Sequence, residues 1–236
     1  MIKIKIANLA IGIENRFSHI EMMAKDYLSE DEPVFTVSVT DSEIEEERSI
    51  SATDCQDGYY ESIVAYRKIA EKLPEYDAFV FHGSVIEMNG NAYIITAHSG
   101  VGKTTHTRLW LSEFPGEASI LNGDKPIVRI IDGKAYACGT PWQGKEDYGK
   151  NEILPIKGIA FLTRASDNRA YVILPGEAVT RFMSQIYLPK QNRMMLLKTM
   201  QLADKVIKEI KLVHLECNMQ PEAAHVCRAA FRQDTK

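Results

Sequence analysis

The chain has 236 residues, of which 45% are hydrophobic and 25% are charged, a composition typical of one globular domain with or without a small addition. Its formal net charge of −4 lacks the basic excess of nucleic-acid-binding proteins, and no apolar run approaches the roughly 20 residues that a membrane helix needs. The four cysteines are scattered and form no Cys-x-x-Cys pair, which argues against a zinc site or a disulfide framework and favours reduced thiols in a cytoplasmic protein.

Residues 1–75 are predicted to form an N-terminal α/β portion, whose independence as a domain the sequence leaves open. Hydrophobic periodicity predicts a strand at residues 2–6, a helix at 19–28, a strand at 34–39 and a helix at 59–73. The acidic run at 41–47 is interpreted as a solvated face or a loop.

Residues 76–236 are predicted to form the larger domain, an α/β fold with a mixed sheet. Its first predicted strands, 78–86 and 92–97, flank Asn89-Gly90, a pair that tolerates the positive φ of a two-residue hairpin. A second hairpin is predicted to turn at Asp132-Gly133. The other predicted elements are a helix around 109–111, strands at 119–122, 128–131, 135–138, 156–162, 171–174 and 212–217, and helices at 177–186, 193–210 and from 221 onward.

The segment from Ala97 to Thr105 matches the P-loop pattern, with alanine in place of the leading glycine. Glycines at 100 and 102 would let backbone N–H groups approach phosphates closely, at the positive end of the helix that follows. In this pattern Lys103 reaches the β- and γ-phosphates of a nucleotide, and the Thr104 hydroxyl binds Mg²⁺. The predicted nucleotide-binding residues are Ser99, Gly100, Val101, Gly102, Lys103, Thr104 and Thr105.

Asp124 is the candidate for the acidic group that a P-loop requires to hold its metal ion. It follows a predicted apolar strand and a glycine, 21 residues after Lys103. A carboxylate beside Mg²⁺ and a γ-phosphate could also accept the proton of an attacking hydroxyl. The alternative is an ordinary turn aspartate, since Gly-Asp pairs favour turns. His98 and His106 flank the loop and are interpreted as packed or solvated rather than catalytic.

The order of these motifs resembles the catalytic domain of bacterial HPr kinases and the nucleotide-binding half of phosphoenolpyruvate carboxykinase. The resemblance rests on His82-Gly83, the hairpin that leads into the P-loop strand, and the strand that ends in Gly123-Asp124. It covers roughly residues 78–231 and extends to short HPr-kinase-like proteins, some of them linked to peptide-modifying gene clusters. Their Gly-x-Pro-Trp-x-Gly-Lys loop is similar to residues 139–145, and their Leu-Thr-Arg-Ala stretch to residues 162–165.

The resemblance implies an ATP- and Mg²⁺-dependent kinase in which Lys103 and Asp124 are catalytic, and it favours a serine hydroxyl as the acceptor. The chain departs from the family at Lys125, where the second acid of an Asp-Asp pair would stand, and it lacks the arginine-containing signature loop of HPr kinases. These departures disfavour HPr itself as the acceptor.

The polar segment 140–151 is the candidate lid and acceptor contact. In that role Lys145 would neutralise charge that develops during transfer, and Trp142 would shield the site from water. The alternative is a surface loop with solvated lysines and an inward-packed tryptophan. Arg164 and Arg193 could bind phosphate or pair with surface acids.

The sequence therefore predicts a cytoplasmic kinase that transfers the γ-phosphoryl group of ATP to a hydroxyl, with no nucleic-acid or membrane partner. Three alternatives remain: a kinase of the same fold that acts on a small metabolite, a non-catalytic regulator that binds a nucleotide, and a structural relic of a P-loop that nucleotide does not stabilise. Lys125 in place of a second acid is the feature that supports the regulator.

Overall fold

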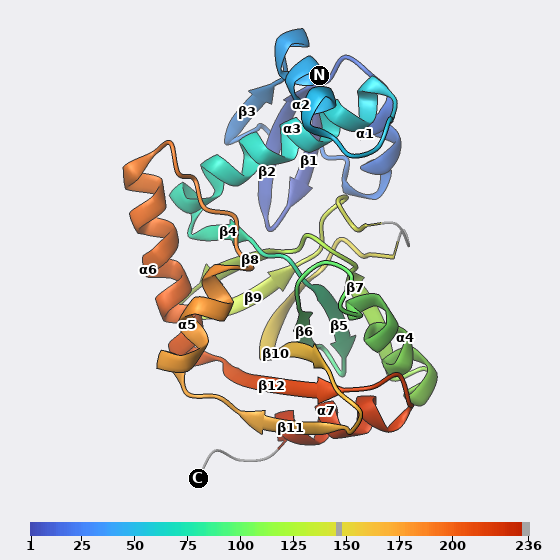
Figure 1. Cartoon of the computed structure of the whole chain (residues 1–236). Coiled ribbons are helices and arrows are strands. Elements are labelled where there is room, and N and C mark those ends of the chain that lie inside the picture. Colours follow the sequence, from blue (N-terminus) through green and yellow to red (C-terminus); the bar gives the residue numbers. More distant parts are fainter. Residues whose placement is uncertain (145–147, 233–236) are drawn as a thin grey trace.

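The computed structural model describes residues 1–144 and 148–232, which form a small N-terminal layer above a larger α/β body (Figure 1). The N-terminal layer contains a three-stranded sheet in the order β1-β2-β3, covered by three helices. Its elements are β1 (Ile2–Ile6), β2 (Leu9–Glu14), α1 (His19–Met23), β3 (Phe35–Ser38), α2 (Asp41–Ile50) and α3 (Asp57–Lys72), with 3₁₀ turns at Lys25–Tyr27 and Leu73–Tyr76.

Local sequence chemistry explains most of this layer. Ala7 and Asn8 adopt positive φ angles of 51° and 57° and turn β1 into the antiparallel β2. The acidic run at 41–47 forms a solvated helix rather than a loop, because Thr40 caps α2 in a capping box with Glu43. The predicted helix at 19–28 is shorter than expected and passes into a 3₁₀ turn after Ala24.

The larger body is a mixed α/β structure built on a nine-stranded sheet, in which β4-β8-β9-β10-β6-β5-β7 are neighbours and β12 joins β10 to β11. Its strands are β4 (Ala78–Val80), β5 (Ser84–Met88), β6 (Asn91–Thr96), β7 (Ala118–Asn122), β8 (Ile127–Ile131), β9 (Lys134–Cys138), β10 (Ile153–Arg164), β11 (Arg169–Val172) and β12 (Lys211–Cys217). Its helices are α4 (Lys103–Glu113), α5 (Pro175–Met183), α6 (Arg193–Glu209) and α7 (Glu222–Arg232).

Strands β6, β10 and β12 run parallel at the centre and are buried on both faces. Side chains of β10 alternate between two cores: Ile159 packs with α5 and α6, and Ala160 packs with α4 and α7. The four helices accordingly cover opposite faces of the sheet (Figure 1). No helix in the described residues is both long and apolar enough to cross a lipid bilayer.

Both predicted hairpin turns are confirmed. Asn89-Gly90 joins β5 to β6 with φ angles of 53° and 72°, and Asp132-Gly133 joins β8 to β9 with 49° and 78°.

The prediction of a single strand at 78–86 is wrong, because the strand is interrupted at residues 81–83 and its two parts pair with different strands. β4 pairs with β8, whereas β5 pairs with β6 and β7. At the break, the Thr96 hydroxyl donates to the His82 carbonyl, and the His82 N–H donates to the Gln185 carbonyl. Contacts with distant segments therefore replace the ladder hydrogen bonds that a continuous strand would make there.

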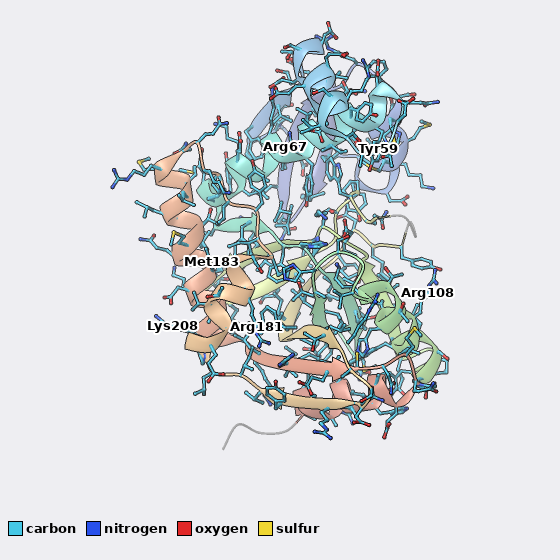
Figure 2. The ribbon with its side chains drawn as sticks, in the orientation of Figure 1. Tyr59, Arg67, Arg108, Arg181, Met183 and Lys208 are labelled. Carbon is cyan, nitrogen blue, oxygen red and sulfur yellow. The ribbon has the colours of Figure 1, made fainter. Side chains whose placement is uncertain are left out.

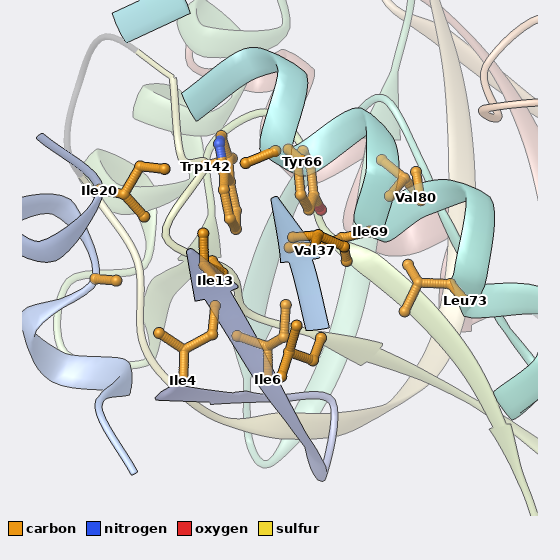
Figure 3. Packing of buried hydrophobic residues seen from close by; sticks show 14 of the residues in the cluster. Ile4, Ile6, Ile13, Ile20, Val37, Tyr66, Ile69, Leu73, Val80 and Trp142 are labelled. Carbon is orange, nitrogen blue, oxygen red and sulfur yellow. The ribbon is translucent and has the colours of Figure 1, made fainter. Parts of the chain in front are cut away.

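A single core crosses from the N-terminal layer into the larger body. Trp142 stacks on Tyr66 of α3 with ring centroids 4.0 Å apart and planes 7° from parallel, and its indole N–H donates to the Ser62 carbonyl. Figure 3 shows the two rings side by side above Ile13 and Val37, which belong to the N-terminal sheet. Trp142 is only 8% exposed, so it fastens the 140–144 segment to the N-terminal layer.

We expect Trp142→Ala to lower the free energy of unfolding by about 3–5 kcal/mol, because it removes a large buried ring and leaves a cavity. Trp142→Phe is the matched control: it keeps an aromatic ring against Tyr66 and should cost less. Urea unfolding followed by circular dichroism measures both variants. A loss below about 1 kcal/mol for Trp142→Ala would show that the two layers do not depend on this contact.

Candidate functional site

A glycine-rich loop, residues 97–102, connects β6 to the first turn of α4. Gly100 and Gly102 adopt φ angles of 77° and 130°, which side-chain-bearing residues rarely adopt. A Cβ atom built on either glycine would have no atom within 4 Å, so open space lies beside the loop. The N–H groups of the first helical turn have no partners within the helix and favour an anion at this end.

Lys103 is the first residue of α4, and its side chain folds back along the loop. Its Nζ atom donates to the carbonyl of Ala97 at 3.1 Å. Burial lowers the pKa of Lys103, and the negative charge of Asp124 partly opposes that shift. The Lys103 side chain therefore lies beside the open space and lines the same cavity as Asp124.

Arg164, at the end of β10, fixes the loop from the other side. Its guanidinium donates from Nε to the Val101 carbonyl at 2.9 Å and from Nη2 to the Gly100 carbonyl. The sequence left its role open between a phosphate contact and a surface ion pair, and in the structure it bonds the loop backbone. Arg164 ends a strand that runs parallel to β6, so its side chain lies at the same edge of the sheet as the loop that follows β6. That pairing is the feature from which its contact with the loop could have been predicted.

Asp124 lies in a turn after β7 that buried side chains hold rigidly. The side-chain oxygen of the fully buried Asn122 accepts the N–H groups of Asp124 and Lys125, and its amide nitrogen donates to Thr140. The Ser84 hydroxyl donates to the carbonyl of Gly123. This turn positions the carboxylate, and Asn122 is a site residue that sequence reasoning did not identify.

Tight packing explains the glycines around this turn. A Cβ on Gly123 would lie 2.2 Å from the Gln143 carbonyl oxygen, and one on Gly139 would lie 1.8 Å from that of Lys150. The 139–144 segment thus presses against the turn, and a Cβ on Gly144 would lie 3.1 Å from the Cβ of Asp124.

Two basic side chains flank the carboxylate of Asp124. Nε2 of His82 lies 3.4 Å from Oδ1, and Nζ of Lys125 lies 2.6 Å from Oδ2. Burial by itself would raise the pKa of Asp124, but the hydrogen bond from His82 and the charge of Lys125 outweigh it and lower the pKa to about 2. Asp124 is therefore ionised throughout the neutral range. Sequence reasoning placed His82 in a motif but did not predict its contact with Asp124.

The loop and the turn face one cavity of about 440 Å³, here called the loop cavity. The predicted residues that line it are Ser99, Gly100, Gly102, Lys103, Thr104, Thr105 and Asp124. Val101 lines an adjoining cavity of about 360 Å³, the strand-end cavity, which the ends of β10 and β12 also border. The structure thus brings together residues that lie up to 25 positions apart in the sequence.

Of the predicted lid segment, Gln143 and Gly144 line the loop cavity but Trp142 does not. Trp142 packs inward against Tyr66 instead of covering the loop cavity, as the alternative interpretation of the 140–151 segment expected. Lys145 lies outside the described residues. His106 is buried, accepts a hydrogen bond from the Trp110 indole and has a pKa lowered to about 4 by burial, so it is a packed neutral histidine. Arg193 begins α6, on the other face of the sheet from α4.

The described residues contain no group of three or more His, Cys, Asp or Glu side chains able to hold a metal ion by themselves. A carboxylate and a hydroxyl do line the loop cavity, from Asp124 and Thr104. Mg²⁺ commonly binds through one or two such protein oxygens and completes its shell with phosphate oxygens and water. A cation at Asp124 would require Lys125 to release Oδ2, and the Lys125 side chain is 39% exposed and has room to leave.

No protein-family model matches the chain, and no curated protein matches it. Among solved structures, the HPr(Ser) kinase/phosphatase from Coxiella burnetii aligns with 52% of this chain and 92% of its own, at 9% sequence identity and a TM-score of 0.32. A likeness this weak identifies neither the family nor the activity of the chain.

We expect Lys125→Met to raise the pKa of Asp124 by about 1 or more, because the variant removes an adjacent positive charge. In the native chain the folded pKa of about 2 lies below the ordinary value of about 3.9. The ion pair therefore stabilises the fold above about pH 4, and its contribution is lost as the pH falls through about 2. Carboxyl NMR titration measures the shift, with Lys134→Met as the exposed-lysine control, and an unchanged pKa in Lys125→Met would contradict the pairing.

Proposed function

We propose that the glycine-rich loop is a P-loop and that the protein is a Mg²⁺-dependent kinase that transfers the γ-phosphoryl group of ATP to a hydroxyl. The observation that carries this proposal is the loop cavity, where the amino end of α4, Lys103 and Asp124 converge on one open space. A helix N-terminus with positive-φ glycines and a lysine forms an anion site whose charge and shape suit the phosphates of a nucleotide.

The strand-end cavity supports a nucleotide rather than a simple phosphate. It adjoins the loop at Gly102 and Thr105 and continues to Leu162, Cys217 and Met219. Its volume of about 360 Å³ lies within the usual range for small-molecule pockets. We assign the base and ribose to this cavity and the phosphates to the loop cavity.

Mg²⁺ would be held by the Thr104 hydroxyl and the Asp124 carboxylate, together with phosphate oxygens. Bound there, the ion neutralises charge on the phosphates and fixes their orientation. The low pKa of Asp124 supports this role, because a carboxylate that is ionised at neutral pH needs no proton loss to bind a cation.

In the transfer step, the acceptor oxygen forms a bond to the γ-phosphorus while the bond from that phosphorus to the β–γ bridging oxygen breaks and ADP leaves. The hydroxyl proton passes to Asp124 or to solvent. A group with a pKa of about 2 is a weak base, so Asp124 serves chiefly by position and charge and accepts the proton only late in the reaction. Lys103 stabilises the negative charge on the transferred group.

The acceptor that we propose is a serine of a protein or peptide, on the strength of the motif resemblance in the sequence. A metabolite kinase of the same fold is the alternative within the kinase class. The mechanism is the same for both acceptors, since each presents a hydroxyl to the same phosphorus atom.

A nucleotide-binding regulator is the second candidate function, and the Lys125–Asp124 ion pair favours it. Lys125 lies 2.6 Å from the oxygen that a metal ion would need. If Lys125 kept that position with nucleotide bound, ATP would bind through the loop without efficient transfer.

We expect Asp124→Asn to abolish phosphoryl transfer while leaving ATP binding largely intact, because the loop and Lys103 would still hold the phosphates. The protein is incubated with Mg²⁺ and γ-labelled ATP in the presence of cell extract split into macromolecular and small-molecule fractions, and nucleotide affinity is measured by calorimetry. Asp132→Asn is the matched control, since that aspartate lies in a hairpin turn and asparagine tolerates its positive φ.

Label in a protein or peptide supports the serine kinase, and label in a small molecule supports the metabolite kinase. Transfer that survives Asp124→Asn contradicts the role of Asp124. Tight binding of ATP with no transfer in either fraction favours the regulator, and the absence of ATP binding rejects the proposal as a whole.

A further inference from the structure

The largest of the cavities described here, about 810 Å³, lies between the N-terminal layer and the Asp124 turn, and we call it the layer cavity. One wall comes from α1 and α3, which contribute Met22, Tyr59 and Ile63 among others, and the other wall comes from residues 141–144. Figure 2 shows Tyr59 in the N-terminal layer, above the larger body. At its floor are Asp124 and Lys125.

Several polar groups in the walls of this cavity are already used within the protein. The Ser62 hydroxyl donates to the Tyr59 carbonyl at 2.7 Å, and the Tyr66 hydroxyl donates to the Lys125 carbonyl at 2.7 Å. The Trp142 indole N–H donates to the Ser62 carbonyl at 3.0 Å. These side chains therefore offer carbon surface to an occupant, and the methionines at the rim adapt their shape easily.

The carboxylate and ammonium groups that line the cavity lie together at one end. Among the described lining residues, the carboxylate and ammonium groups are those of Asp124 and Lys125, and they pair with each other. Against the side chain of Ile63 and the stacked rings of Tyr66 and Trp142, a charged or many-hydroxyl body would lose its hydration without gaining hydrogen bonds, which is unfavourable. A large uncharged apolar body would lose no such interactions and would gain from burial.

The layer cavity and the loop cavity meet at the same residues, because Asp124, Gln143 and Gly144 line both. A molecule whose body fills the layer cavity would thus place its polar end beside the carboxylate that faces the loop. A volume of about 810 Å³ suits a drug-sized body better than a single short side chain.

We propose that the layer cavity binds the body of the phosphoryl acceptor and that this body is large, uncharged and apolar, with its reactive hydroxyl at Asp124. The identification of the occupant as the phosphoryl acceptor rests on the proposed kinase function. The binding of an apolar body rests on the cavity alone. It gives the N-terminal layer the task of selecting the acceptor, and it disfavours sugars and other small polar metabolites.

The test compares two uncharged probes, 2-(2-naphthyl)ethanol and glycerol, by calorimetry on the full chain with and without Mg²⁺ and a non-hydrolysable ATP analogue. We expect the naphthyl alcohol to bind at least about tenfold more tightly than glycerol, because an aromatic body gains that much from burial. Met22→Glu places a charge at the cavity rim, where Met22 is 63% exposed, and should weaken naphthyl binding about fivefold or more without affecting the nucleotide analogue. Met194→Glu, on α6 and 72% exposed, is the matched control and should change neither affinity.

A second arm separates two sources of an apolar body. The dipeptides N-acetyl-Trp-Ser-amide and N-acetyl-Asp-Ser-amide are compared as probes beside the naphthyl alcohol. Preference for the tryptophan dipeptide over both the aspartate dipeptide and the alcohol assigns the cavity to a peptide side chain, and preference for the alcohol assigns it to a small molecule.

Equal binding of glycerol and the naphthyl alcohol overturns the inference, as does an identical response of Met22→Glu and Met194→Glu. Failure of the kinase function gives a different result. If the protein binds the naphthyl alcohol in a Met22-dependent way but binds no ATP analogue, the proposed kinase function is rejected. The proposal of an apolar binding site is then retained. If Met22→Glu leaves phosphoryl transfer to every probe unchanged, the kinase function is retained. The proposed role of the layer cavity in binding the acceptor is then rejected.

Discussion

The buried amide of Asn122 is the interaction on which the arrangement of the site depends. Its oxygen accepts two consecutive backbone N–H groups and its nitrogen donates to Thr140, so one side chain fixes both the turn and the segment packed against it. A buried amide left without these partners would cost free energy, which makes the geometry of the turn hard to change. The Tyr66 hydroxyl adds a bond to the Lys125 carbonyl from the N-terminal layer. The carboxylate of Asp124 is therefore held by both parts of the molecule.

The electrostatics of that carboxylate set what the site can do. His82 and Lys125 keep it ionised, and they also occupy both of its oxygens. A cation at this position has to displace Lys125, whose exposed side chain can leave more easily than the buried backbone around it could move. For the function proposed above, this competition would distinguish a kinase from a nucleotide-dependent regulator, because it decides whether a metal ion can bind the carboxylate and the phosphates together.

Three cavities meet around the glycine-rich loop and the Asp124 turn, and their different walls suggest different occupants. The loop cavity offers backbone N–H groups and Lys103, which suit phosphates. The strand-end cavity adjoins it at the carboxyl ends of parallel strands, where ligands commonly bind in α/β proteins. The layer cavity has largely apolar walls and meets the loop cavity at Asp124, Gln143 and Gly144. On this view the N-terminal layer contributes to the site directly, through α1 and α3.

The sequence by itself determined the features that depend on neighbouring residues. Asn89-Gly90 and Asp132-Gly133 specify their turns through positive φ, and the glycines at 100 and 102 specify an open loop between a strand and a helix. Tertiary structure alone decided the features that depend on distant residues. The break at residues 81–83, the inward packing of Trp142 on Tyr66 and the approach of His82 to Asp124 all arise from contacts that periodicity does not encode. Local backbone preferences act within a few residues, whereas burial and ion pairing depend on which segments the fold brings together.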